Sequence, residues 1–391
     1  MNKAADIIFF PAEEFCPQNQ KWMGCPSIER TGKRTWISWF TGGKYEPCIY
    51  NYACISYFDD SDEVLGEPYM VILCHPEDGQ RINDPQLWRD AKGRLWVFWA
   101  QQSFSLTAHA SDYDTPGDVL SAHFMEHQQL WGMYTENPEA DEPVWSQPRY
   151  IADGNLRNKA TVLSDGTTVL PCYLYEDRDH YRYLSSCDDG MSVTVERGPA
   201  KHERNSFEEP MIVERKDGSL WFLVRTFTGH IAAASSFDGG KTWTPTEETD
   251  IPNPCTRFYI GRLQNGMLLL VNTPSAVFGD RKSLVASLSE DDGKTWPYSL
   301  LLDDRRFTTY PDVTQAEDGR LYVVYDCQRD NRLAVCPDDE TRSEAAKEIC
   351  VASITVEDII NGKITSPESY LKRIANKSTY DKYVVGIDLT R

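Results

Sequence analysis

The sequence predicts an all-β protein: a six-bladed β-propeller of four-stranded antiparallel blades, formed by a single domain over residues 1–391. A polar turn containing glycine, followed by a strand rich in Trp, Leu, Val and Tyr, recurs six times along the chain. The turn glycines are separated by 61, 73, 52, 48 and 53 residues, which suits one four-stranded blade with its loops. Helical periodicity is absent until SEAAKEI and VEDIING near the C-terminus.

The glycine turns define the hairpins of the predicted blades. Asp-Gly or Asn-Gly between short β-type runs is a strong hairpin signal, because glycine readily adopts positive φ. The six turn glycines are Gly32, Gly93, Gly166, Gly218, Gly266 and Gly319. Radial packing buries both apolar faces of each sheet against its neighbours. We expect the apolar segment 7–11 (IIFFP) to join the last blade and close the ring, since an open propeller exposes a sheet edge.

An eight-residue motif, S-x-D-x-G-x-T-W, supports the repeat assignment. It occurs as SFDGGKTW from Ser236 and as SEDDGKTW from Ser289, with degenerate copies from Ser186 and Ser56. An Asp side chain in such a turn accepts backbone N–H hydrogen bonds. We therefore interpret the Asp of this motif as a turn residue and assign it no chemistry.

The segment before each glycine turn is expected to be the innermost strand of its blade. In most of these segments a polar residue precedes a proline or an equivalent break, where the inner strand begins at one end of the axis. The residues at these positions are Cys25, Asp84, Asn158 with Lys159, Glu209, Arg257 and Tyr310. Charges beside a dry axis are costly, so their convergence indicates a binding or catalytic site. The alternative is a network of mutually paired ions with a structural role.

The composition excludes several classes of protein. A net charge of −20 argues against a nucleic-acid partner, because the chain repels a phosphate backbone. No apolar run approaches the roughly 18 residues of a membrane-spanning helix, so no membrane partner is expected. Eleven scattered cysteines without a CxxC pair argue against a zinc site or a disulfide framework, and we expect no metal and no cofactor. The short apolar patch at the N-terminus does not make a signal peptide, which favours the cytoplasm unless a secreted form was trimmed.

The S-x-D-x-G-x-T-W motif resembles the Asp-box, or bacterial neuraminidase repeat, of the sialidase superfamily. The stretch Glu209–Gly218, followed by Arg225, resembles the family segment that bears the catalytic Glu and the second arginine of a carboxylate-binding triad. Arg281 resembles the third arginine, and Tyr310 in TTYPDVTQAEDG resembles the nucleophile. The resemblance implies that Tyr310 attacks the sugar, that Glu209 accepts its proton, and that the arginines bind the substrate carboxylate.

Two positions depart from the family pattern. The stretch that carries the first triad arginine reads Gly24-Cys25-Pro26 here, and the position of the general-acid Asp is matched by Asn51, which cannot donate a proton as an acid. These departures predict a divergent subgroup. Asp84 on blade two is our candidate for the replacement acid.

Further side chains are candidates for substrate binding. Arg257 offers a second cation for an acidic sugar or forms an interblade salt bridge, and Lys159 either binds substrate or is a solvated rim lysine. Asn158 stands beside Lys159 in the ring. Trp131 is expected on a mobile loop between blades, where an aromatic ring suits a substrate wall.

The predicted function is that of an exo-acting glycoside hydrolase of the sialidase superfamily, which removes a terminal, acidic sugar from an oligosaccharide or glycan. Two alternatives remain open. The first is a uronate-directed lyase on the same fold, which the missing acid favours, and the second is a non-catalytic glycan-binding propeller. The sequence indicates neither the sugar nor the oligomeric state.

Overall fold

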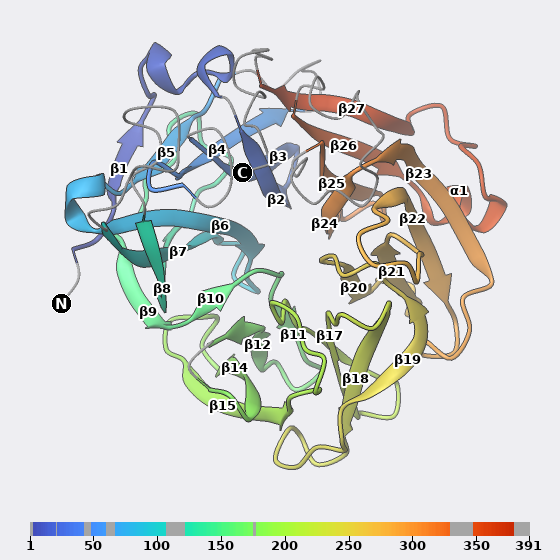
Figure 1. Ribbon diagram of the computed structural model, residues 1–391. Helices are drawn as coiled ribbons and strands as arrows, with labels where there is room; N and C mark the ends of the chain where they lie inside the picture. Colours follow the sequence, from blue (N-terminus) through green and yellow to red (C-terminus); the bar gives the residue numbers. More distant parts are fainter. Residues whose placement is uncertain are drawn as a thin grey trace, which may run out of the picture.

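The computed structural model describes residues 3–20, 22–42, 48–59, 67–106, 122–174, 177–328 and 347–378. Six blades surround a central axis and follow one another in chain order (Figure 1). Each blade contains a four-stranded antiparallel sheet. Its four strands follow one another in sequence order from the axis to the outer edge. The prediction of an all-β, six-bladed propeller is confirmed.

The first three blades include the short 3-10 helices and an additional pair of strands. Blade one comprises β2 (Met23–Thr31), β3 (Arg34–Thr41), β4 (Tyr52–Asp59) and β5 (Met70–Leu73), and blade two comprises β6 (Gln80–Arg89), β7 (Leu95–Leu106), β8 (Ala122–Thr135) and β9 (Arg149–Asp153). Blade three comprises β11 (Thr161–Val162), β12 (Thr168–Leu170), β14 (His180–Ser186) and β15 (Thr194–Ala200), with a separate pair of β10 (Asn155–Leu156) and β13 (Cys172–Tyr173). Short 3-10 helices cover Glu13–Phe15, Pro17–Asn19 and Pro76–Asp78.

Each of the last three blades consists of one sheet of four strands. Blade four comprises β16 (Met211–Glu214), β17 (Leu220–Val224), β18 (His230–Ser236) and β19 (Glu247–Pro252), and blade five comprises β20 (Tyr259–Arg262), β21 (Leu268–Asn272), β22 (Lys282–Ser289) and β23 (Tyr298–Arg306). Blade six comprises β24 (Thr308–Gln315), β25 (Leu321–Cys327), β26 (Glu348–Ile354) and β27 (Tyr370–Lys377), with the short helix α1 (Val356–Asn361) before its last strand. None of the helices in these described ranges has the length and apolar character needed to cross a membrane.

The N-terminal strand corrects one prediction. β1 (Asp6–Phe9) pairs with β5 at the outer edge of blade one, with Ile7 opposite Ile72 and Ile8 opposite Val71. Blade six already has four strands of its own. In blade one, β5 is a short apolar strand whose outer backbone groups would be left unpaired without β1. The expectation that segment 7–11 would complete the last blade was therefore wrong.

Blades one and six meet without sharing a strand in the part of the chain that the structure describes. Asp312 Oδ2 of β24 accepts hydrogen bonds from Ser27 Oγ (2.6 Å) and from the amide of Ile28 (2.9 Å). Asp326 Oδ2 of β25 accepts one from the amide of Cys25 (2.9 Å). An apolar cluster that contains residues of both blades adds to these contacts. Side chains thus close the ring.

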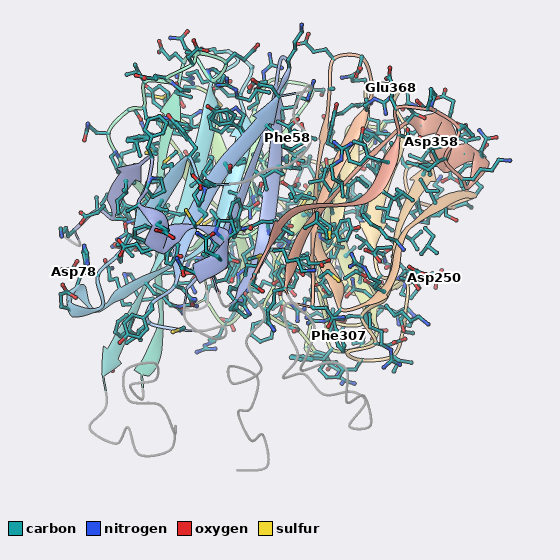
Figure 2. All side chains as sticks on the ribbon, turned by 90° about the horizontal axis from the view of Figure 1, so that it is seen from above. Phe58, Asp78, Asp250, Phe307, Asp358 and Glu368 are labelled. Atoms are coloured by element: carbon teal, nitrogen blue, oxygen red, sulfur yellow. The ribbon has the colours of Figure 1, made fainter. Side chains whose placement is uncertain are left out.

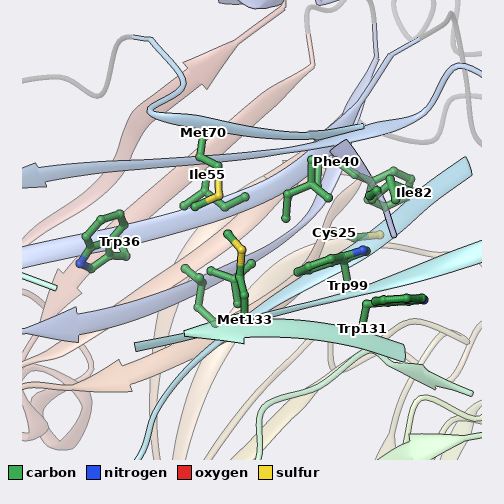
Figure 3. Close-up of a cluster of buried hydrophobic side chains, with 14 of the residues drawn as sticks. Cys25, Trp36, Phe40, Ile55, Met70, Ile82, Trp99, Trp131 and Met133 are labelled. Carbon is green, nitrogen blue, oxygen red and sulfur yellow. The ribbon is translucent and has the colours of Figure 1, made fainter. Parts of the chain in front are cut away.

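Apolar side chains also fill the boundary between blades one and two. Trp36, Ile55 and Met70 of blade one lie in the same buried cluster as Trp99 and Met133 of blade two (Figure 3). Burial of large aromatic rings between adjacent sheets is a main source of stability in such a core.

Four inner strands begin with an unusual backbone conformation. The residues Cys25, Asp84, Glu209 and Tyr310 each precede a proline, and their φ angles are 50°, 48°, 46° and 55°. In blades one, two and six the strand register shifts across this residue and its proline. A bulge of this kind removes residues from the ladder and redirects a side chain, and the positive φ of a non-glycine residue is strained.

The two faces of the propeller carry different features. Phe307, directly before β24, and Phe58, near the end of β4, lie on opposite faces (Figure 2). Because the strands of a blade alternate in direction, the inner strands begin on the Phe307 face, and the turns after each third strand lie on the other face. The turns of the S-x-D-x-G-x-T-W motif, between β18 and β19 and between β22 and β23, are on this second face.

Candidate active site

A buried cluster of Tyr310, Glu209 and Arg225 occupies the face where the inner strands begin. The Tyr310 hydroxyl donates a hydrogen bond to Glu209 Oε1 (2.8 Å). Arg225 Nη1 donates to Glu209 Oε2 (2.9 Å) and to the Tyr310 hydroxyl oxygen (3.0 Å). The exposed fractions of the three side chains are small, at 5% for Tyr310, 0% for Glu209 and 3% for Arg225. The structure thus brings these three predicted residues into direct contact.

The electrostatics of the cluster favour an ionised Glu209. Burial alone would raise the pKa of Glu209, but the guanidinium groups of Arg225 and Arg157 outweigh burial and hold the pKa below its usual value. Arg225 has its own pKa raised well above the usual value: burial opposes its charge, but Glu209 outweighs this effect. The carboxylate is therefore available to accept the Tyr310 proton, and Arg225 is placed to stabilise the oxygen that loses it.

Arg157 is a site residue that the sequence analysis missed. Its Nη1 lies 3.2 Å from Glu209 Oε1, and its Nε lies 2.8 Å from Asp84 Oδ2. Arg157 thereby connects two residues that were both predicted for the site. Blade three has no proline at its ring position, so the alignment fell on Asn158 and Lys159 rather than on the preceding arginine.

Asp84 lies close to the cluster but in a state that an acid catalyst cannot use. Its Oδ2 accepts hydrogen bonds from Asn83 Nδ2 (2.8 Å) and Asn155 Nδ2 (3.0 Å), in addition to the ion pair with Arg157. Burial would raise the pKa of Asp84, but Arg157 and the two amides outweigh it and lower the pKa. A general acid must hold a proton, so the geometry does not support the predicted role.

Arg225 and Arg281 converge on Cys255. Arg225 Nε donates to Cys255 Sγ (3.3 Å), and Arg281 Nη2 donates to the carbonyl oxygen of Cys255 (3.0 Å). Arg281 is 5% exposed. The two arginines that resemble triad members therefore share Cys255 as a partner, and Arg225 also contacts Tyr310.

The side chains of Asn158 and Arg257 donate hydrogen bonds to backbone carbonyls of the protein itself. Asn158 Nδ2 donates to the carbonyls of Glu209 (2.8 Å) and Pro210 (3.0 Å). Arg257 donates three hydrogen bonds to backbone carbonyls, including that of Tyr310. The expectation that these residues bind substrate directly has no support in this geometry.

Lys159 is likewise neutralised inside the protein. Its Nζ lies 3.1 Å from Glu29 Oε2 and 3.3 Å from Asp312 Oδ2, and it donates to the carbonyls of Ile28 and Leu87. Burial would lower the pKa of Lys159, but the two carboxylates outweigh burial and raise it. The alternative of mutually paired ions describes this residue, and the idea of a solvated rim lysine was wrong.

Trp131 does not lie on a loop. It belongs to β8, is 8% exposed, and packs beside Trp99 in the cluster between blades one and two (Figure 3). The sequence LWGMYT lies in the longest interval between turn glycines, which is why the sequence predicts an insertion there. A substrate wall at Trp131 is excluded by this burial.

Two further positions bear on the departures from the family pattern. Asn51 accepts hydrogen bonds from the Cys48 amide (2.8 Å) and from Arg81 Nη1 (2.8 Å), so it is held in place as a neutral amide. Cys25 is buried in the apolar core. Within the described residues, no group of three or more His, Cys, Asp or Glu side chains is arranged to hold a metal ion.

Comparison with known proteins supports the fold and the repeat assignment. Residues 62–323 match the family model of the BNR repeat-like domain. The anhydrosialidase of Macrobdella decora is 27% identical over 145 residues, which make up 32% of this chain and 19% of that protein. The chain thus spans about a fifth of the length of this curated relative.

Solved structures of sialidases share the fold. The Hadza microbial sialidase Hz136 gives a TM-score of 0.59 at 19% identity, covering 78% of this chain and 63% of its own. The leech intramolecular trans-sialidase complexed with 2,7-anhydro-Neu5Ac gives 0.63 at 14% identity, covering 92% and 71%. The intramolecular trans-sialidase from Ruminococcus gnavus gives 0.62 at 14% identity, covering 93% and 99%. At these identities the likeness shows the fold.

Proposed function

Because the chain belongs to the family of BNR repeat-like domains and has a sialidase-type propeller, we propose that it is a glycosidase for a terminal acidic sugar of a glycan. Tyr310 is the proposed nucleophile, Glu209 its proton acceptor, and Arg225 and Arg281 the groups that bind the sugar carboxylate. The observation that carries the proposal is the mutual contact of the Tyr310 hydroxyl, Glu209 and Arg225.

The chemistry of this cluster suits nucleophilic attack. A free tyrosine has a pKa near ~10 and is a weak nucleophile at neutral pH. Transfer of the phenol proton to Glu209 generates the attacking oxygen, and Arg225 balances the negative charge that develops there. A neutral tyrosine also approaches an anionic sugar without the repulsion that a carboxylate nucleophile would meet. The glycosyl–oxygen bond to Tyr310 forms as the bond to the leaving oxygen breaks.

The proposed site differs from that of an ordinary glycosidase because we identify no acid that protonates the leaving oxygen. Arg157 and two amides outweigh burial and lower the pKa of Asp84, which favours its ionised form, and Asn51 is a neutral amide, so we expect neither to supply the proton. We therefore expect turnover to depend steeply on the leaving group, with aryl glycosides cleaved much faster than alkyl-linked oligosaccharides. A ratio near one between the two classes would show that another group acts as the acid.

A fluorogenic substrate panel tests the proposed activity. Sialosides, uronides and deoxyhexosides of 4-methylumbelliferone are incubated with the protein and with Glu209→Gln, which removes the proton acceptor. We expect release from acidic sugars only, and its loss in the variant. Silence on the whole panel, together with no binding to a glycan array, would overturn the proposal; binding without turnover would instead favour the non-catalytic propeller.

Intramolecular transfer is a second candidate outcome of the same attack. The curated relative is named an anhydrosialidase, and two of the similar structures are intramolecular trans-sialidases. Product analysis distinguishes the routes: hydrolysis gives a reducing sugar, intramolecular transfer gives an anhydro-sugar, and elimination gives an unsaturated product that absorbs in the ultraviolet.

A further inference from the structure

Arg257 links four blades at the propeller axis through hydrogen bonds to backbone carbonyls. From its place before β20 of blade five, its Nη1 donates to the carbonyl of Arg157 (2.7 Å), in blade three. Its Nη2 donates to the carbonyls of Pro26 (2.8 Å), in blade one, and Tyr310 (2.9 Å), in blade six. The side chain is 1% exposed, and in the described part of the chain its guanidinium forms no ion pair with a carboxylate.

Two of the three carbonyls that Arg257 binds belong to residues at bulges. The register of blade one breaks between Gly24 and Ser27, and that of blade six between Thr309 and Asp312. Pro26 and Tyr310 lie inside these breaks, outside the paired positions of the ladder. Buried carbonyls without a donor are costly. One guanidinium satisfies both, and so stabilises the strained backbone of Tyr310, whose φ is 55°.

Arg257 also lies against the ring of Tyr310. The centre of its guanidinium is 4.9 Å from the ring centroid, within the range of a cation–π contact. Backbone and ring of the proposed nucleophile are thus fixed by the same side chain, while Glu209 and Arg225 fix the hydroxyl.

We propose that Arg257 is a positioning residue for Tyr310, which it holds in the left-handed conformation that places the hydroxyl on Glu209. This inference rests on the proposed function, and it replaces the sequence-based expectation that Arg257 binds the substrate carboxylate. The two roles differ in their consequences. A positioning residue affects the chemical step, whereas a carboxylate ligand affects the affinity for acidic substrates.

Three variants test the proposal. Arg257→Lys keeps the charge and part of the hydrogen bonding, Arg257→Met removes both, and Arg262→Lys is the matched control. Arg262 is also in blade five and donates across a blade boundary to the Glu214 carbonyl (2.8 Å), but at the far end of the inner strand. On the best substrate of the panel we expect Arg257→Lys to lower kcat about tenfold and Arg257→Met about a hundredfold or more, with KM within about twofold. Arg262→Lys should leave both parameters unchanged.

A structural readout makes the test independent of turnover. In crystals of Arg257→Lys or Arg257→Met we expect the φ of Tyr310 to relax or its hydroxyl to leave hydrogen-bond distance of Glu209 Oε1. An unchanged Tyr310, or a rise in KM with kcat preserved, would overturn the positioning role. So would failure of both variants to fold, which would assign Arg257 to the scaffold. If the wild-type protein turns over no substrate, the proposed function fails, and the crystal comparison still decides whether Arg257 positions Tyr310.

Discussion

The hydroxyl oxygen of Tyr310 lies 2.8 Å from Oε1 of Glu209, although the two residues are 101 positions apart in the sequence. Both follow the same construction, a strained residue before a proline at the start of an inner strand. The repeat therefore does more than form the sheets: it brings Asp84, Glu209 and Tyr310 of three blades into one connected cluster.

Removal of the Tyr310 hydroxyl is expected to abolish turnover while the fold persists. Tyr310→Phe should lower kcat/KM by about a thousandfold or more, since the nucleophile and its contact with Arg225 are lost. Tyr325→Phe is the control: it removes a buried hydroxyl that donates to Asp303 (3.0 Å) in the same half of the propeller. The measurement is kcat/KM of both variants on the best aryl glycoside, and circular dichroism checks that both are folded. A Tyr310→Phe protein that keeps a tenth of the activity would exclude Tyr310 as the nucleophile.

The buried pair of Arg225 and Glu209 should be strongly coupled. Arg225→Met leaves the Glu209 charge with Arg157 alone, and we expect a loss of about 3 kcal/mol or more in the free energy of unfolding. Adding Glu209→Gln should recover part of this loss. Urea unfolding of the wild type, the two single variants and the double variant forms a double-mutant cycle, from which we expect a coupling free energy of roughly 1–3 kcal/mol between Arg225 and Glu209.

An exposed ion pair provides the contrast for this cycle. Arg89 lies 3.3 Å from Glu317, whose side chain is 81% exposed. Arg89→Met should change the unfolding free energy by less than about 1 kcal/mol. Additive effects in the buried cycle would show that the contact contributes no net coupling.

Glu208 should make stability depend on pH. Burial raises the pKa of Glu208 to about 7, and the opposing hydrogen bond from Lys201 does not cancel it. Between pH 4.5, the ordinary value, and pH 7 the folded state retains a proton that the unfolded state has lost. The stability from protonated Glu208 is therefore fully present below the unfolded value and falls as the pH rises towards 7.

The neutral variant Glu208→Gln isolates this effect. The difference in unfolding free energy between wild type and variant should shift by about 2–3 kcal/mol against the wild type from pH 5 to pH 7.5. Chemical denaturation at several pH values measures it. A difference that does not vary with pH would refute the raised pKa.

The turn aspartates should matter for stability and not for turnover. Asp291 accepts hydrogen bonds from Ser289 Oγ (2.8 Å), the Thr295 amide (2.9 Å) and Thr295 Oγ1 (2.7 Å), which lower its pKa to about 2. Asp291→Ala should reduce the melting temperature at pH 7 and leave kcat unchanged, because the turn lies on the face away from Tyr310. Since the anion is the stabilising form, the difference in melting temperature should shrink as the pH falls from 3.8 towards 2. A drop in kcat at unchanged stability would contradict the structural role.

The sequence revealed those parts of the site that a local pattern marks. A polar residue before proline, in register with a glycine turn, located Asp84, Glu209 and Tyr310, and each has a left-handed φ in the structure. Periodicity and turn chemistry were sufficient here because the same local geometry is repeated. Arg225 was predicted from the resemblance to the sialidase superfamily, and it directly follows the second strand of its blade.

The roles of the remaining cations depended on contacts that no local pattern encodes. Arg257 donates to backbone carbonyls of three other blades, and Lys159 is fixed by two carboxylates from distant strands. The neutral Asn158 likewise donates to backbone carbonyls of blade four. Arg157 escaped notice because blade three lacks the proline that anchored the alignment elsewhere. The pairing of β1 with β5 likewise depends on the tertiary structure, because it is the outer edge of blade one that lacks a partner strand.

The way in which the ring closes concerns the position of Tyr310. In the described chain, blades one and six are joined by side-chain contacts and apolar packing, with Asp312 of β24 and Asp326 of β25 as hydrogen-bond acceptors. Tyr310 lies on β24 at that boundary, and Arg257 donates to the carbonyls of both Tyr310 and Pro26 of blade one. The seam of the propeller and the proposed nucleophile therefore share their supports, and we expect a substitution that loosens the seam to displace the Tyr310 hydroxyl from Glu209 as well.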